Sequence, residues 1–224
     1  MNKSTPLAGP DDILPTYTRI AERFDRERDC SVFERAHLET VWNAAPGPRV
    51  LDLGCGSGRP IATWFTDQGA KVTSVDGAPS MIALFNRYLP DQRGIVADMR
   101  DLDLGETFDA VLAFNSLFHL RAEDQRSLFQ LLARHCKPRA HLFFSSGHSD
   151  GEDWGKSGGA PVYHASLAPE VYRRLLIDNG FSDITFQPND PTCRHHCLWH
   201  ATFIGNTAAA NSKMLENGAD EDDR

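Results

Sequence analysis

The sequence predicts a doubly wound α/β domain with a Rossmann-like sheet of seven strands and helices on both faces. From residue 49 onward, short apolar segments alternate with longer segments of helical periodicity. The connections between most apolar segments are long enough for parallel crossovers. The stretch at residues 187–194, between the last two segments, is too short for one. We therefore expect a mostly parallel sheet whose last strand runs antiparallel.

Two helices are predicted before the first strand, between about residues 12 and 42. Tyr17, Ile20, Ala21 and Phe24 follow the i, i+3, i+4, i+7 spacing of an apolar helix face. The pattern Ser31-x-x-Glu34 is typical of a capping box and predicts the start of the second helix. We expect both helices to close over a site on the sheet.

The expected elements follow from the chain in order. Strands are predicted at residues 50–53, 72–76, 94–97, 108–114, 140–145, 183–186 and 198–204, and helices at 60–68, 79–88, 122–136 and 168–179. The resulting organisation is an N-terminal helical lid (1–45), a main domain (46–205) and an acidic tail (206–224). The tail lacks aromatic residues and ends in a run of acids, so we expect it to be disordered.

Composition restricts the function classes. No apolar run approaches the ~18–20 residues that span a bilayer, so we expect no membrane partner. The formal net charge of −8 disfavours a nucleic-acid partner. Five scattered cysteines and no secretory signal favour reduced thiols and a cytoplasmic location. The oligomeric state stays open, with a homodimer as one option.

A glycine-rich turn follows the first predicted strand. Residues 49–53 run into Gly54-Cys55-Gly56-Ser57-Gly58, where bare peptide groups let a ligand approach the backbone. The spacing is G-x-G-x-G, with Asp52 two residues before the first glycine, and differs from the G-x-G-x-x-G of dinucleotide sites. The alternative is that these glycines only make a turn.

Polar residues end the next three strands. Asp76 lies about 20 residues past the glycines, where a carboxylate can accept hydrogen bonds from both hydroxyls of a ribose. It could instead cap the helix that begins near Pro79. Asp98 could accept a hydrogen bond from an adenine amino group, with Met99 packed on the ring, and Asn115 follows the fourth strand. These side chains should meet at one edge of the sheet.

These motifs resemble, in order and spacing, those of the class I S-adenosylmethionine-dependent methyltransferases, over roughly residues 50–204. The resemblance implies S-adenosylmethionine as cofactor. Its implied binding residues are Tyr17, Asp52, Gly54, Cys55, Gly56, Asp76, Gly77, Met81, Asp98, Met99, Arg100 and Asn115. The segments Tyr17–Phe24 and Asn115–Leu120 are similar to a bacterial small-molecule branch of that family. Its members often have Asp where this chain has Asn115, so a base at this position is in doubt.

The methyl acceptor should be a small molecule, methylated on an oxygen or nitrogen atom, with sulfur and carbon less favoured. His119 follows the fourth strand, and a long glycine-rich loop at residues 147–159, expected to close over the pocket, precedes Tyr163 and His164. We predict His119, His148 and Tyr163 as catalytic candidates, with His164 as a further acceptor contact. The alternatives are a packed histidine at His119 and a solvated loop.

Other functions remain open at this point. The chain could be a non-catalytic regulatory protein that binds S-adenosylmethionine or a nucleoside. A nicotinamide dehydrogenase is disfavoured by the glycine spacing. The cluster Cys193-Arg194-His195-His196-Cys197-Leu198-Trp199-His200 carries typical zinc ligands, but a strand from Leu198 would scatter them over two faces, so we expect no metal.

Overall fold

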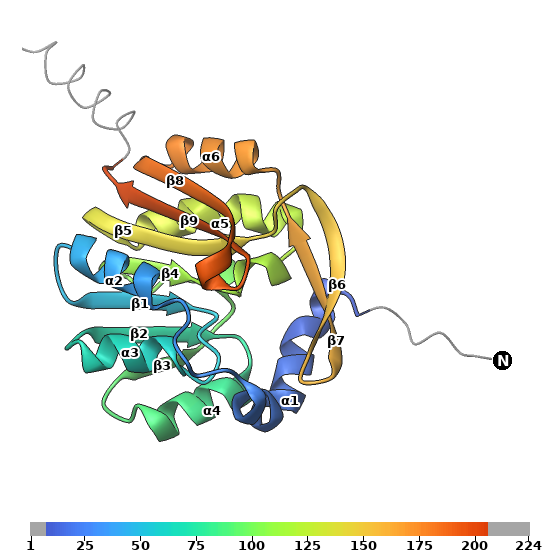
Figure 1. Ribbon diagram of the computed structural model, residues 1–224. Coiled ribbons are helices and arrows are strands. Elements are labelled where there is room, and N and C mark those ends of the chain that lie inside the picture. Colours follow the sequence, from blue (N-terminus) through green and yellow to red (C-terminus); the bar gives the residue numbers. More distant parts are fainter. Residues whose placement is uncertain (1–7, 206–224) are drawn as a thin grey trace, which may run out of the picture.

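A computed structural model describes residues 8–205 and contains one seven-stranded sheet (Figure 1). Its strands are β1 (Arg49–Leu53), β2 (Lys71–Asp76), β3 (Arg93–Val96), β4 (Phe108–Ala113), β5 (Cys136–Ser146), β8 (Phe181–Asp190) and β9 (His196–Phe203). The spatial order is β3-β2-β1-β4-β5-β9-β8. The last strand, β9, is antiparallel to both neighbours, and the other pairs are parallel. The predicted fold class is confirmed.

Helices cover both faces of the sheet (Figure 1). They are α1 (Ile13–Glu27), α2 (Arg35–Ala44), α3 (Ile61–Asp67), α4 (Pro79–Tyr88), α5 (Ala122–Arg134) and α6 (Pro169–Asp178). Four short 3₁₀ turns connect elements: η1 (Pro10–Asp12), η2 (Met99–Asp101), η3 (Leu117–His119) and η4 (Pro191–Cys193). Apolar residues of α5 and α6 pack on one face of the sheet, and those of α2, α3 and α4 pack on the other.

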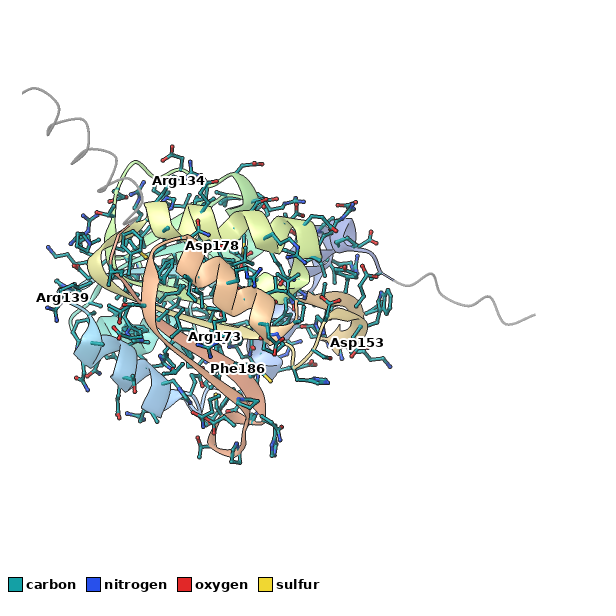
Figure 2. All side chains as sticks on the ribbon, turned by 90° about the horizontal axis from the view of Figure 1, so that it is seen from above. Arg134, Arg139, Asp153, Arg173, Asp178 and Phe186 are labelled. Atoms are coloured by element: carbon teal, nitrogen blue, oxygen red, sulfur yellow. The ribbon has the colours of Figure 1, made fainter. Side chains whose placement is uncertain are left out.

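Alternating strand residues divide the core into these two layers. In β1, Leu51 and Leu53 join the layer under α5, whereas Val50 joins the layer under α2 and α3. The largest buried side chain, Trp199 of β9, is covered by two residues labelled in Figure 2. Phe186 of β8 stacks on it with a centroid distance of 4.2 Å, and the Arg173 guanidinium of α6 lies 6.0 Å from the ring.

The start of α2 differs from the prediction. The helix begins at Arg35 with Glu34 as its N-cap residue, so Ser31-x-x-Glu34 is not a capping box. The reason is local: the Asp29 carboxylate accepts a hydrogen bond from the Ser31 amide and holds that segment in a turn. Helix α2 then lies flat on the sheet through the buried side chains of Leu38 and Val41.

The predicted loop at residues 147–159 is mostly a β-hairpin, which corrects the prediction. Strands β6 (Gly151–Ser157) and β7 (Ala160–Ser166) pair in antiparallel register across Gly158 and Gly159, both with positive φ. Strand β6 is largely exposed, so its sequence lacks the apolar alternation that would have revealed it. The hairpin stands beyond the carboxyl ends of the parallel strands, beside α1 (Figure 1).

Within residues 8–205, no helix is long and apolar enough to cross a membrane. The predicted disordered tail at 206–224 lies outside the described residues. Figure 2 shows the two ends of the sheet: Arg139, near the start of β5, lies at one end, and Asp153 of the hairpin lies at the other. The candidate site lies at the hairpin end.

Candidate functional site

A cavity of about 790 Å³ lies where the carboxyl ends of β1, β2, β4 and β5 meet α1 and the β6–β7 hairpin. This is the edge at which open α/β sheets bind ligands, and the volume is in the range of small-molecule sites. Its lining includes most of the predicted positions: Tyr17, Gly54, Gly56, Asp76, Gly77, Met81, Asp98, Met99, Arg100, Asn115, His119, His148 and His164.

The glycine turn forms one end of this cavity. Gly54 has a φ of +70°, and a Cβ atom there would lie 2.3 Å from Cβ of Ser116, so the fold itself requires glycine. Gly56 has a φ of +57°, but the nearest atom to its Cβ would be 3.7 Å away, in the Phe24 ring. The space in front of Gly56 is therefore open to a ligand.

Asp76 connects this turn to the second strand. One carboxylate oxygen accepts a hydrogen bond from the Gly56 amide (2.9 Å), and the other accepts one from the Ala78 amide (2.8 Å). Burial raises the pKa of Asp76, while the two amide hydrogen bonds lower it. Each oxygen keeps a second lone pair, so the carboxylate can accept further hydrogen bonds from a ligand in the cavity.

Helix α1 is anchored to the same turn by Asp25, near its C-terminal end. The buried Asp25 carboxylate accepts hydrogen bonds from the Ser57 hydroxyl (2.5 Å) and the Tyr88 hydroxyl (2.6 Å). This contact fixes α1 across the glycine turn, so Tyr17 and Phe24 of α1 form one side of the cavity. Helix α2 contributes no residue to the cavity lining of the described chain, because it packs on the sheet.

Asp52 and Cys55, both predicted to bind the cofactor, lie beneath the cavity lining. Cys55 is turned into the core layer under α3, and the Asp52 side chain is buried next to the turn. Burial raises the pKa of Asp52 to about 7, while the charge of Arg28 lowers it. Arg28, which the sequence analysis missed, does line the cavity and faces Gly56. No motif marks it, because it comes from the end of α1 rather than from a strand end.

Asp98 and Arg100 lie at the end of β3. The Asp98 carboxylate accepts hydrogen bonds from the backbone amide (2.9 Å) and the guanidinium of Arg100, and these lower the pKa of Asp98. Arg100 therefore fixes the orientation of Asp98. Met99 lies between them in the cavity wall, near Gly54.

Asn115 follows β4 in a left-handed conformation with a φ of +52°. The Ser145 hydroxyl accepts a hydrogen bond from the Asn115 amide and donates one to its side-chain oxygen. Because a carboxamide has no basic atom and its oxygen is already bound, Asn115 is not a proton acceptor.

His119 has a defined tautomer. Its Nδ1 lies 2.8 Å from the carbonyl oxygen of Tyr163, which can only accept, so Nδ1 carries the proton. Its Nε2 therefore accepts the hydrogen bond from the Tyr17 hydroxyl, at 3.0 Å. Burial lowers the pKa of His119 to about 4, so the ring is neutral at pH 7. Both ring nitrogens thus already have protein partners.

The other residues predicted to contact the acceptor lie in different surroundings. The Tyr163 side chain is buried outside the cavity, where its hydroxyl donates to Glu152, and burial raises its pKa to about 12. Strand alternation explains this, since its neighbours Val162 and His164 line the cavity instead. The prediction of Tyr163 as a catalytic group is corrected. His148 is exposed at the rim, and His164 packs against Phe118 and His119.

Three aromatic rings from other segments also line the cavity. His196 stacks with Phe33 (centroids 5.9 Å apart, 27° between planes) and lies 5.4 Å from Phe114 at 31°. Arg194 lies over Phe33, 4.4 Å from the ring centroid, and forms an ion pair with Asp29. We call Phe33, Phe114 and His196 the aromatic wall. No motif in the sequence indicates this wall, because its members come from three distant segments.

The Cys193–His200 cluster does not converge on one point. Cys193 and Cys197 are buried in the core, while His196 borders the cavity. Across residues 8–205, no group of three Cys, His, Asp or Glu side chains is placed to hold a metal ion. His200 instead joins a chain of hydrogen bonds beneath α2, which runs from Asp190 to His37 (2.8 Å), His200 (2.9 Å) and His141 (2.9 Å).

Comparison with known families identifies one matching model. Residues 50–139, from β1 into β5, match the family described as a methyltransferase domain. The matched region includes the glycine turn, Asp76, Asp98 and Asn115. It ends before the hairpin and the β8–β9 turn.

Curated relatives cover a similar part of the chain. The cypemycin N-terminal methyltransferase of a Streptomyces species is 34% identical over 118 residues, which are 50% of this chain and 46% of the relative. The ubiquinone biosynthesis O-methyltransferase of Hahella chejuensis is 34% identical over 112 residues, 46% of this chain and 44% of the relative. The chain thus matches less than half the length of these relatives.

The fold extends further than the sequence similarity. The S-adenosylmethionine-bound structure of CalS10, an amino pentose methyltransferase from Micromonospora echinaspora, superposes with a TM-score of 0.65. The match covers 90% of this chain and 99% of that chain at 20% identity. At this identity, the similarity supports the fold alone.

Proposed function

We propose that the chain is a class I S-adenosylmethionine-dependent methyltransferase that methylates an oxygen or nitrogen atom of a small molecule. The observation that carries this proposal is the Asp76 carboxylate, held by the Gly56 and Ala78 amides at the edge of a ligand-sized cavity. When bound, S-adenosylmethionine supplies an activated methyl group on a positively charged sulfur.

We call the part of the cavity at the glycine turn, Asp76 and Asp98 the donor end, and its residues fit this cofactor. A Cβ at Gly56 would project into the open space where a ligand can lie against the backbone. Asp76 would hold the ribose hydroxyls, and Asp98 with Met99 would hold the adenine, as the resemblance implies. Met81 and Gly77 also line the cavity, and a Cβ at Gly56 would lie 4.0 Å from the Met81 sulfur.

Arg28 adds a positive charge in front of the glycine turn. Its guanidinium packs 5.6 Å from the centroid of the Phe24 ring. We propose that Arg28 holds the carboxylate of the methionine part, since a guanidinium binds carboxylates through two parallel hydrogen bonds. Asp52, buried nearby with its pKa raised, would act on Arg28 rather than contact the cofactor directly.

Methyl transfer is an in-line displacement, so the chain must mainly align two reactants and exclude water. Helix α1 and the β6–β7 hairpin are proposed to form the cover of the site. The Tyr17–His119 hydrogen bond would fix the Tyr17 hydroxyl against the reacting groups. Since both nitrogens of His119 are occupied, we assign it a positioning role, and His148 at the rim is proposed to contact the acceptor.

We also propose where the enzyme acts, which class of acceptor it takes and how it assembles. All five cysteines are free thiols, which supports a reducing compartment such as the cytoplasm. The net charge of −8 supports a small-molecule acceptor over nucleic acid. A homodimer remains a prediction, to be checked by light scattering.

The proposed function is tested by turnover. The protein is incubated with S-adenosylmethionine and a panel of phenols, quinols, amino sugars and peptide amines, and S-adenosylhomocysteine release is measured. Acceptor-dependent release supports the proposal. Cofactor binding without release for any acceptor would favour the non-catalytic binding protein instead.

A further inference from the structure

Four histidines line the cavity, and their surroundings differ. Both nitrogens of His119 have partners, as described above. His148 is exposed to solvent at the rim. His164 packs edge-on against Phe118, 4.8 Å between centroids, and beside His119. His196 is the fourth, and it lies in the aromatic wall of the cavity.

His196 has its proton position fixed by the backbone. Its Nδ1 lies 2.7 Å from the carbonyl oxygen of Cys193, which can only accept a hydrogen bond. The neutral ring therefore carries its proton on Nδ1 and a lone pair on Nε2. Among the described residues, nothing is hydrogen-bonded to Nε2. His196 thus offers an uncommitted proton acceptor at the cavity.

The ring plane of His196 is also fixed. The ring centroids of Phe33 and Phe114 lie 5.9 Å and 5.4 Å from that of His196, at interplanar angles of 27° and 31°, and the two phenyl planes are inclined by 54° to each other. The segment that carries His196 is held in place by the ion pair between Arg194 and Asp29 and by the left-handed conformation of Arg194 and His195. Because aromatic rings also pair in tilted and edge-to-face arrangements, three rings in one cavity wall favour an aromatic ligand.

We propose that the methyl acceptor is a hydroxyl-bearing aromatic ring that packs on the aromatic wall and gives its proton to Nε2 of His196. This inference rests on the proposed function. The O–H bond of the acceptor breaks, its electron pair stays on the oxygen, and the proton forms a new N–H bond at Nε2. The resulting imidazolium later releases this proton to water. A hydroxyl benefits from such a base more than an amine does, because a neutral amine already has a reactive lone pair.

The proposal is tested with 4-nitrophenol, whose ionised form absorbs visible light. Binding and ionisation of the probe are followed against pH in the presence of S-adenosylhomocysteine, for the wild type and three variants. His196→Phe keeps an aromatic ring but removes the base. Phe33→Ala removes part of the wall. His195→Asn is the matched control, since His195 is the exposed neighbour outside the cavity lining, and asparagine tolerates its positive φ.

In the wild type, the bound probe should ionise at least one pH unit below the free probe, and His195→Asn should behave identically. His196→Phe should still bind the probe, but with the ionisation curve of the free probe. Phe33→Ala should weaken probe binding at least tenfold. If the probe bound to His196→Phe ionises at the same pH as the probe bound to the wild type, the role of His196 is overturned. If the folded wild type does not bind the probe, the aromatic acceptor is overturned.

Two measurements keep these outcomes interpretable. If His196→Phe does not fold, His196→Gln replaces it, because glutamine is polar but takes up no proton. Calorimetric binding of S-adenosylhomocysteine is measured on every sample. Loss of that binding in the wild type would contradict the proposed function, whereas normal binding with a failed probe experiment would contradict only the inference about the acceptor.

Discussion

The two ends of the cavity are built in different ways. At the end proposed for the methyl donor, backbone amides and strand-end side chains from residues 50–99 form the surface together with Tyr17 and Arg28, and Asp76 joins two of those amides. At the end proposed for the acceptor, side chains from the α1–α2 loop, the end of β4 and the start of β9 form the aromatic wall. A surface built from backbone groups suits a ligand that is the same in all related enzymes. A side-chain-built surface can be altered by single substitutions without disturbing the sheet.

The matched family model covers the two ends unequally. It spans residues 50–139, which include the glycine turn, Asp76 and one ring of the aromatic wall, Phe114, but not Arg28, Phe33 or His196. The printed names of the relatives also differ, from a cypemycin N-terminal methyltransferase to a ubiquinone biosynthesis O-methyltransferase. We propose that the donor end is common to the family, whereas the acceptor end differs between individual enzymes.

The largest effect is expected from Gly54→Ala at the donor end. The new Cβ would lie 2.3 Å from Ser116 at a φ of +70°, which combines overpacking with backbone strain. We expect a loss of about 3 kcal/mol in the free energy of unfolding and a cofactor affinity too weak to measure. Urea denaturation checks the first, and calorimetry the second.

Gly69→Ala is the control for this prediction. Gly69 has a φ of +89°, but nothing lies within 4 Å of the added Cβ, so only the backbone strain remains. The control should lose about 1 kcal/mol and keep its cofactor affinity. Equal losses in the two variants would show that the contact with Ser116 does not matter.

Asp76→Ala should weaken S-adenosylhomocysteine binding by more than tenfold, or upwards of about 1.4 kcal/mol. The substitution removes the acceptor for two ribose hydroxyls and frees the Gly56 and Ala78 amides. Asp91→Ala, at an exposed site after α4, should leave the affinity unchanged. Unchanged affinity in Asp76→Ala, measured by calorimetry, would remove this carboxylate from the cofactor site.

A pH effect is expected beneath α2, behind the acceptor end. In this chain of hydrogen bonds, His37 can donate from Nε2 to Asp190 and accept at Nδ1 from Nε2 of His200, and His200 can accept at Nδ1 from Nε2 of His141, so an unprotonated His200 has partners for both ring nitrogens. Burial, with the neighbouring histidines, lowers the pKa of His200 to about 3. Below about 6.5 the unfolded chain therefore binds more protons than the folded chain at this site.

The contribution of His200 to stability is thus present above pH 6.5 and is lost as the pH falls toward 3. We expect the free energy of unfolding to decrease by about 1 kcal/mol per pH unit from this group. His200→Gln should be less stable at pH 7 but should lose less on acidification to pH 5. The free energy of unfolding of both proteins is measured against pH by urea denaturation. If it changes with pH by the same amount in wild type and variant, His200 is not held neutral.

The smallest effect is expected from Tyr163→Phe. The substitution removes only the hydrogen bond from the Tyr163 hydroxyl to Glu152, outside the cavity, at a cost of about 1 kcal/mol. Its backbone carbonyl, which fixes His119, is retained. Turnover and cofactor affinity should stay within twofold of the wild type. A large loss of turnover at constant affinity would return Tyr163 to the acceptor site.

The sequence could predict the sheet and the donor end because both depend on local patterns. Apolar segments and crossover lengths gave the seven strands and the antiparallel β9. The G-x-G-x-G spacing and the strand-end acids indicated the positions that line the cavity near Gly56. These features lie within about fifty residues, so their register along the chain predicts their proximity in space.

The acceptor end could not be predicted in the same way. Phe33, Phe114 and His196 meet only after the β8–β9 turn folds back toward the α1–α2 loop. The hairpin was read as a loop because exposed strands with glycines lack apolar alternation, and its true register turned Tyr163 away from the cavity. Arg28 was missed because a single arginine at a helix end carries no motif.

The central claim is that the cavity binds S-adenosylmethionine through the donor end. Calorimetric titration of the purified protein with S-adenosylhomocysteine, with NADH as the control ligand, tests it most directly. We predict micromolar binding of S-adenosylhomocysteine, about −8 kcal/mol, and no binding of NADH. Folded protein that fails to bind S-adenosylhomocysteine, or that binds NADH in its place, would contradict the account.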